Sequence, residues 1–235
     1  MSICRDITRE LRSYANPERA KVLRRFFKTA PGEYAAGDVF LGINVPIIRS
    51  IAKKYRSALC QDDIESLLHS KYHEERLLAL LLMIERYADD PKKIVTMYLR
   101  NIKVSVNNWD LVDISAHKIV GRYFEDKPKD KLAKLAVSKS LWERRVAMVA
   151  TYWHIRKGDC QAALDIAEIL VNDEHDLIQK AVGWMLREVG NRCPIKAERE
   201  FLDRHAQTMP RTMLRYAIEK FSPRVRQYYL HLKKI

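Results

Sequence analysis

Residues 143–157, ERRVAMVATYWHIRK, consist of basic residues followed by an apolar segment with helical periodicity, and this arrangement recurs along the chain. It reappears as HEERLLALLLMIERY at 73–87 and as LIQKAVGWMLREVG at 177–190. The repeats lie about 35 residues apart when they are aligned on one position each, Arg76, Leu111, Arg145 and Lys180. A period of this length with two helices per unit is typical of an α-helical solenoid.

The rest of the sequence also predicts helices joined by short turns. The prolines stand where helices are expected to begin, because the first turn tolerates a residue without an N–H group, and Pro31 opens the loop-like stretch. Gly121, Gly158 and Gly190 each follow an apolar segment, where a helix C-cap is expected. No segment alternates apolar and polar residues as a half-buried strand does. The tetratricopeptide consensus is absent, which favours HEAT-like packing.

We therefore predict an all-α fold, a superhelical solenoid of HEAT-like helix pairs in a single domain over residues 1–235. In a stacked array, one helix of each pair lines the concave surface. The basic residues of the alignment recur on the same member of each pair. A concave basic groove is the consequence, and such a groove suits a duplex polyanion.

The composition is that of a soluble globular protein with a basic surface. Of 235 residues, 47% are hydrophobic and 31% are charged, and 43 Lys and Arg against 30 Asp and Glu give a net charge of +13. The longest apolar run, Leu77 to Ile84, is far shorter than a membrane span, and the N-terminus lacks the apolar region of a signal peptide. We expect a cytoplasmic protein whose partner is nucleic acid and not a membrane; a basic protein without a polyanionic partner is the alternative.

The cysteines and histidines give no metal-site pattern. The four cysteines, Cys4, Cys60, Cys160 and Cys193, form no CxxC pair, which excludes a zinc ribbon or a thioredoxin-like motif. We expect buried free thiols. His69 and His73, four residues apart, could share a helix face, but we expect them to be bystanders.

Two predicted helices carry candidate DNA-contact residues. On the helix at 177–190, Lys180, Trp184 and Arg187 form one stripe away from the apolar face. An aromatic side chain between two cations suits contact with a sugar or base, although packing of Trp184 against the next repeat is the alternative. On the helix at 143–156, Arg145 could bind a phosphate bidentately, or it could be a solvated cation whose stem covers apolar surface.

The segment 107–121, NNWDLVDISAHKIVG, places Trp109 and Asp113 four residues apart on one helix face. Asp113 occupies a position that is apolar in the other aligned repeats, and residues that break a local rule concentrate at functional sites. A salt bridge or an inter-repeat hydrogen bond is the alternative role for this carboxylate. Asp110, in the first turn, is expected to cap the helix.

A single carboxylate beside tryptophans in a cationic groove limits the possible chemistry. No pair of acids indicates two-carboxylate glycoside hydrolysis. One carboxylate suffices where the leaving group needs no proton, as with purines alkylated at N3 or N7, because alkylation makes the base cationic. The carboxylate would then stabilise the developing oxocarbenium sugar or position the attacking water.

Four blocks resemble, in order and spacing, the AlkD family of HEAT-like-repeat DNA alkylation repair glycosylases: FLGINVPIIR (40–49), NNWDLVD (107–113), WERRVAM (142–148) and QKAVGWMLREVG (179–190). The resemblance covers essentially the whole chain. It implies a monofunctional glycosylase of base excision repair that excises cationic N3- and N7-alkylpurines from duplex DNA without base flipping. It further implies that Asp113 stabilises the sugar cation, that Trp109 and Trp184 contact the deoxyribose, and that Arg145 holds the DNA backbone.

We expect a wider DNA-binding set, namely Phe26, Lys28, Lys180, Arg187, Arg211 and Arg215. Family members have a tyrosine where this chain has Phe26, so either the hydroxyl is dispensable or Tyr34 supplies it. We expect that it needs no metal or cofactor, because water is the nucleophile and the sequence shows no ligand cluster. We also expect a monomer, because nothing in the sequence requires a larger assembly. The alternatives are a non-catalytic protein that binds distorted or branched DNA, which the Trp109 and Asp113 pair argues against, and a protein-interaction scaffold.

Overall fold

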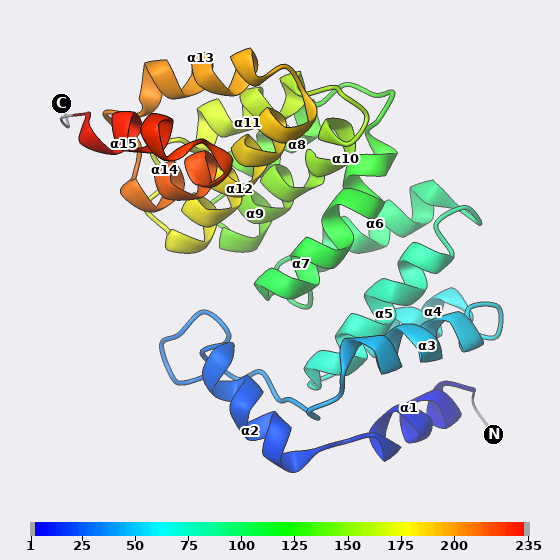
Figure 1. Cartoon of the computed structure of the whole chain (residues 1–235). Helices are drawn as coiled ribbons and strands as arrows, with labels where there is room; N and C mark the ends of the chain where they lie inside the picture. The colour runs from blue at the N-terminus through cyan, green and yellow to red at the C-terminus, as the bar shows by residue number, and fades with distance from the viewer. Residues whose placement is uncertain (1–2, 233–235) are drawn as a thin grey trace. The chain divides into compact units, whose positions relative to one another are not determined.

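Helices joined by turns and loops make up residues 3–232, the part that this computed structural model describes (Figure 1), and the prediction of an all-α fold is confirmed. Within this part the β-structure is limited to one isolated bridge between Val39 and Tyr72. None of the described helices is long and apolar enough to cross a membrane. The contacts divide the chain into two compact units, which meet within one helix between Leu111 and Val112. That the chain forms a single domain stays a prediction.

The first unit contains six helices and the start of a seventh. They are α1 (Ile3–Ser13), α2 (Pro17–Phe26), α3 (Val45–Tyr55), α4 (Gln61–Leu68), α5 (His73–Glu85) and α6 (Pro91–Asn101), and α7 (Trp109–Ala116) begins at its end. Helices α1, α3 and α5 pack in succession, and α4 packs on α5. Helix α5 is buried along almost its whole length. From Leu77 to Met83 its residues are apolar on every face of the helix, so no face is suited to contact with water.

The segment between α2 and α3 is fixed by a buried carboxylate of α5. Glu74, 2% exposed, accepts hydrogen bonds from the backbone N–H groups of Leu41, Gly42 and Ile43, at 2.8, 2.7 and 3.2 Å. Gly42 has a φ of +83°, and a Cβ there would lie 2.2 Å from the Asn16 carbonyl oxygen. Only glycine fits this position, which explains the Phe-Leu-Gly-Ile stretch at the start of the block at 40–49.

The second unit continues from α7 with helices in two rows. It comprises the π-helix η1 (His117–Gly121), α8 (Asp130–Ala136), α9 (Leu141–Ala150), α10 (Tyr152–Ile155), α11 (Gln161–Leu170), α12 (Asp176–Arg192), α13 (Ile195–His205), α14 (Arg211–Ala217), the 3₁₀-helix η2 (Ile218–Lys220) and α15 (Pro223–His231). One row packs in the order η1, α9, α12 and α14, while α8, α11 and α13 form the other row (Figure 1). These stacked pairs are the arrangement expected of an α-solenoid, whereas the concave basic groove stays a prediction.

Hydrogen bonds define the repeat register, and it differs by one residue from the sequence alignment. Arg76, Arg144 and Gln179 each donate from the side chain to the backbone carbonyl groups five and six residues earlier. The equivalent of Arg76 is therefore Arg144 and not Arg145. Arg76 is also only 5% exposed and binds Asp38, so it contributes nothing to a basic surface.

The three glycines predicted as C-caps have different roles. Gly158 follows α10 with a φ of +83°, as expected for a cap. Gly190 lies inside α12, and a Cβ there would meet the carboxylate of Glu198. Gly121 ends η1 against the Ala150 carbonyl oxygen. The last two predictions are wrong, because glycine at these sites permits close packing between helices instead of a left-handed turn.

Two of the cysteines form a disulfide, so the prediction of four free thiols is wrong for this pair. Cys160 lies directly before α11 and Cys193 directly after α12, and their Cα atoms are 6.5 Å apart. The two helices run antiparallel, which brings the start of one beside the end of the other. Cys4 and Cys60 are not disulfide-bonded.

Candidate active site

Asp113 forms a bidentate salt bridge with Arg145. The arginine donates from Nε to Oδ1 at 2.9 Å and from Nη2 to Oδ2 at 2.8 Å. Asp113 lies on α7 and Arg145 on α9, the next helix of the same row, and the carboxylate keeps 20% of its side chain exposed. The fork of the guanidinium fixes the plane of the carboxylate more firmly than a single hydrogen bond does.

Arg145 is buried, so its interpretation as a solvated cation is wrong. It is 5% exposed, and its third nitrogen, Nη1, donates to the Leu177 carbonyl oxygen at 2.5 Å. All three guanidinium nitrogens therefore bind protein acceptors, on α7 and at the start of α12. The salt bridge considered as the alternative role for Asp113 is therefore present. Arg145 is the group that orients the Asp113 carboxylate.

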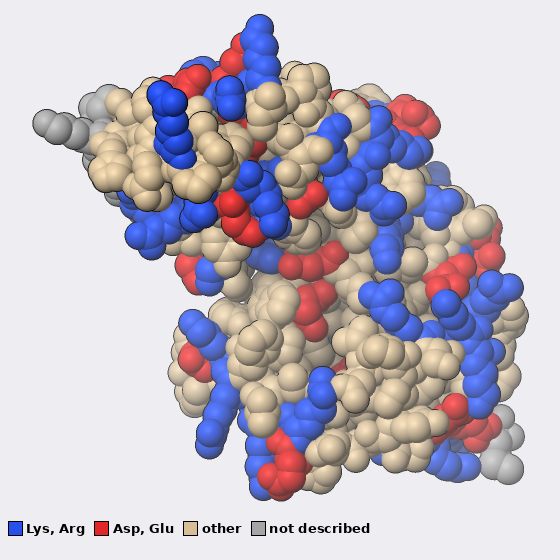
Figure 2. Space-filling model, viewed as in Figure 1, with Lys and Arg blue, Asp and Glu red and all other residues tan. Residues whose placement is uncertain are grey.

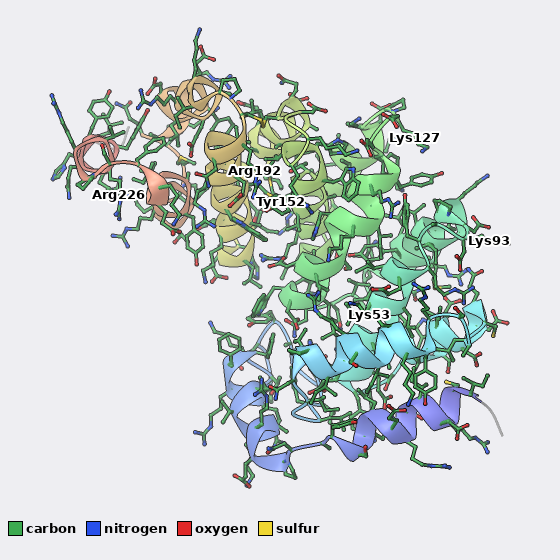
Figure 3. The ribbon with its side chains drawn as sticks, turned by 45° about the vertical axis from the view of Figure 1, so that its right-hand side comes forward. Lys53, Lys93, Lys127, Tyr152, Arg192 and Arg226 are labelled. Carbon is green, nitrogen blue, oxygen red and sulfur yellow. A yellow bond between two sulfur atoms is a disulfide. The ribbon has the colours of Figure 1, made fainter. Side chains whose placement is uncertain are left out.

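Trp184 lies in a row of aromatic side chains that crosses the second unit. Its ring is half-buried and 5.9 Å from that of Tyr152, and the Tyr152 ring is in turn 5.5 Å from that of His117. Arg192 donates to the Tyr152 hydroxyl at 3.3 Å, and Figure 3 shows these two side chains facing one another between α10 and α12. Trp184 of α12 therefore packs against α10, which precedes it in the chain, and part of its surface remains accessible.

His117 and Tyr152 are members of this row that the sequence analysis missed. His117 follows Asp113 by one helical turn and begins the π-helix, a distortion that is frequent at functional sites. Burial lowers the pKa of His117 to about 4, and the charge of Lys118 acts in the same direction. The imidazole is therefore neutral at pH 7. Tyr152 shares the helix face of Arg145, which was the only sequence feature that could have pointed to it.

Trp109 packs in an aromatic cluster of the first unit. Its ring stacks on Phe27 at 5.2 Å with an interplanar angle of 20° and meets Phe26 edge-on at 5.9 Å. Its Nε1–H donates to the hydroxyl of Tyr34 at 3.2 Å. Both residues considered in place of the family tyrosine therefore contact Trp109. The exposed Phe26 contacts it with its ring, and Tyr34 accepts a hydrogen bond from it at its hydroxyl.

A buried ionic network supports the start of α7. His73, 2% exposed, contacts Asp110 through Nε2 at 2.8 Å and Asp38 through Nδ1 at 3.3 Å. Asn108 donates to Asp38 and accepts from the Trp109 N–H. Two predictions are therefore wrong, since Asp110 binds His73 instead of capping the helix, and His73 is not a bystander. Its partners are remote in the sequence, and no local spacing revealed them.

The pKa of His73 predicts a pH dependence of stability. Burial alone would lower this pKa, but the charge and hydrogen bond of Asp110, with that of Asp38, outweigh it and raise the pKa from 6.5 to about 9. Below pH 6.5 both the folded and the unfolded chain carry the proton, so the stabilisation is complete. It is lost as the pH rises through the folded pKa. We expect the advantage of wild type over His73→Gln in the free energy of unfolding to shrink by about 3 kcal/mol across this window.

Urea unfolding of both proteins at several pH values measures this effect. The comparison with the variant is needed because burial raises the pKa of Glu198 to about 8, and this carboxyl group titrates in an overlapping range. Glu198 is present in both proteins and cancels in the difference. An advantage that stays constant from pH 6.5 upward would show that His73 does not hold its proton in the folded chain.

The predicted DNA-binding cations differ in how far they are paired. Lys28 and Arg215 are exposed, with no ion pair to a described carboxylate. Lys180 binds Asp176, and Arg187 binds Glu219 and Glu188. Arg211 donates to the Leu230 carbonyl oxygen. On the face shown in Figure 2, Lys and Arg side chains are spread over both units with acidic side chains among them.

No group of three His, Cys, Asp or Glu side chains that could hold a metal ion occurs within residues 3–232.

The model of the family described as "DNA alkylation repair enzyme" matches residues 7–221. A solved structure described as a predicted DNA alkylation repair enzyme from Enterococcus faecalis is similar, with a TM-score of 0.72 at 19% identity, covering 89% of this chain and 97% of that chain. At this identity the likeness shows a shared fold. The curated proteins contain no match.

Proposed function

This chain belongs to the family of DNA alkylation repair enzymes, and on that premise we propose that it is a DNA glycosylase for cationic purines. It would hydrolyse the N-glycosidic bond of N3- or N7-alkylated purines in duplex DNA, without flipping the base. The observation that carries the proposal is the partly exposed carboxylate of Asp113, held in a fixed plane by the buried Arg145. A carboxylate oriented before the reaction can stabilise the positive charge that develops on the sugar.

Each remaining site residue has a role that follows from its surroundings. Trp109, braced by Phe27 and Tyr34, and Trp184, beside Tyr152, offer flat surfaces that suit deoxyribose or base contact. Arg145 acts through Asp113 as a positioning residue, because its three nitrogens already bind protein. Water would be the nucleophile, so the reaction is proposed to proceed in the presence of a metal chelator. The protein is proposed to act as a monomer.

The alternative is a non-catalytic protein of the same fold that binds distorted or branched DNA. One observation favours it: both Asp113 oxygens already accept hydrogen bonds from Arg145, as they would in a structural salt bridge. The exposed part of Asp113 and the tryptophan one turn before it on α7 favour the glycosylase.

Release of free base from methylated duplex DNA tests the proposal. We expect wild type, with EDTA present, to release 7-methylguanine or 3-methyladenine faster than the same DNA loses them in buffer alone, and to leave unmethylated DNA intact. Chromatography of the soluble fraction measures both bases. Release at the buffer rate, with tight binding to branched DNA, would favour the non-catalytic protein instead.

A further inference from the structure

The C-terminal part of the chain is basic throughout. From Lys220 to the end, the sequence contains no Asp or Glu and five Lys or Arg residues. Helix α15 (Pro223–His231) lies in this stretch and carries Arg224 and Arg226, both exposed. It also lies beyond residue 221, where the match to the family model ends. The helix is therefore a feature of this chain outside the matched region.

Helix α15 is held firmly against the second unit. Tyr229 is 3% exposed, and its hydroxyl donates to Asp203 of α13 at 2.8 Å. Arg211 of α14 donates to the Leu230 carbonyl oxygen at 2.6 Å, which satisfies an acceptor in the last turn of α15. Two anchors on two different helices give α15 a fixed position, so its backbone does not have to be ordered when a partner binds.

The outer face of α15 carries one cation, Arg224, and an exposed aromatic side chain. Four exposed residues at helical spacing make up this face: Arg224, Gln227, Tyr228 and His231. Tyr228 is 59% exposed, among the most exposed aromatic side chains of the described chain. Arg226, labelled in Figure 3, is exposed too. It follows Arg224 by two residues, which at about 100° per residue places it about 160° away around the helix axis.

The charge of Arg224 is not neutralised by the protein. It forms no ion pair with a carboxylate of residues 3–232. Other surface cations of the second unit do, among them Lys157 with Glu125, Lys180 with Asp176 and Arg192 with Glu188. An unpaired guanidinium attracts an anion more strongly than a paired one, because no internal salt bridge has to be broken first.

We propose that the outer face of α15 binds the sugar-phosphate backbone of duplex DNA, outside the site that contacts the lesion. Arg224 binds a phosphate, and Tyr228 packs against the adjoining sugar. The inference rests on the proposed function for its partner, since DNA is the polyanion that a DNA repair enzyme meets. Cations beside exposed aromatic side chains are the pattern of nucleic-acid contact, and this face has the complementary charge.

The salt dependence of DNA binding tests this contact. Binding of an undamaged duplex is measured by fluorescence anisotropy over a series of KCl concentrations, for wild type and for Arg224→Gln. Loss of one phosphate contact is expected to reduce the slope of log K against log salt by about 0.9 and to weaken binding at every salt concentration. Arg224→Lys keeps the charge and is expected to keep the slope. Tyr228→Ala is expected to weaken binding several-fold with an unchanged slope.

Arg226→Gln is the matched control, because it removes the same charge from the same helix on its other side. An equal effect of Arg226→Gln and Arg224→Gln would overturn the proposed face in favour of diffuse attraction. If Arg224→Gln keeps the slope and the affinity of wild type, the proposed DNA contact is wrong, and α15 only covers the end of the helical array. Because the duplex is undamaged, this result does not depend on base release. A reduced slope in Arg224→Gln, together with no base release by wild type, would contradict the glycosylase proposal but support the DNA contact of α15.

Discussion

Asp113→Asn is expected to reduce the rate of 7-methylguanine release by about 100- to 1,000-fold, the size of effect seen when one preorganised charge-stabilising group is lost. The amide keeps the shape of the side chain but carries no negative charge, so it cannot stabilise a cationic sugar. Affinity for undamaged duplex should stay near that of wild type, because the substitution removes no cation. Single-turnover release and anisotropy measure the two quantities separately.

The control for this experiment is Asp126→Asn, which neutralises an exposed carboxylate in the same unit. It is expected to release base at the wild-type rate, which separates a local effect from a change in net charge. A thermal melt must show that Asp113→Asn is folded at the assay temperature, since its neighbour Arg145 loses a charged partner. If Asp113→Asn is folded and releases base at the wild-type rate, the Asp113 carboxylate has a structural role only and takes no part in base release.

The helices could be predicted from sequence because the information that specifies them is local. Apolar residues at helical spacing and prolines in first turns indicated the all-α fold, and the structure confirms it. The disulfide between Cys160 and Cys193 could not be predicted in the same way, since it depends on how two helices pack. The register of Arg76 was missed for a similar reason, because only its hydrogen bonds identify Arg144 as its equivalent.

The candidate site was predictable only in part. Asp113 stood out because an acid replaced an apolar residue in the repeat, a contrast visible within one sequence. Its partner Arg145 lies on α9, and no pattern in the sequence indicated that the two side chains meet. The same limit applies to His73, whose contacts with Asp38 and Asp110 join three separate segments. A charged residue is expected to be exposed unless a partner for its charge is known, and the sequence does not identify such partners.

Arg145→Met is expected to lower the free energy of unfolding by about 4 kcal/mol, within the range for breaking a buried ion pair by removing one partner. The methionine fills much of the space of the arginine stem, so the loss comes mainly from two acceptors. These are the Asp113 carboxylate and the Leu177 carbonyl oxygen, which both lose their donor. Urea unfolding monitored by circular dichroism measures the change. Arg156→Met, at an exposed position directly after α10, should change stability by less than about 0.5 kcal/mol.

The double variant Asp113→Asn, Arg145→Met measures how much the interaction between the two side chains contributes to the free energy of unfolding, apart from the contribution of each side chain alone. If the two side chains stabilise each other, the double variant is more stable than the sum of the single losses predicts, by about 1 to 3 kcal/mol. Arg145→Lys adds a test of geometry, because lysine keeps the charge but cannot form the bidentate contact. It should retain more stability than Arg145→Met, yet release base more slowly than wild type. Additive losses in the double variant would mean that Arg145 stabilises the fold through Leu177 alone, and that the plane of the Asp113 carboxylate is set by something else.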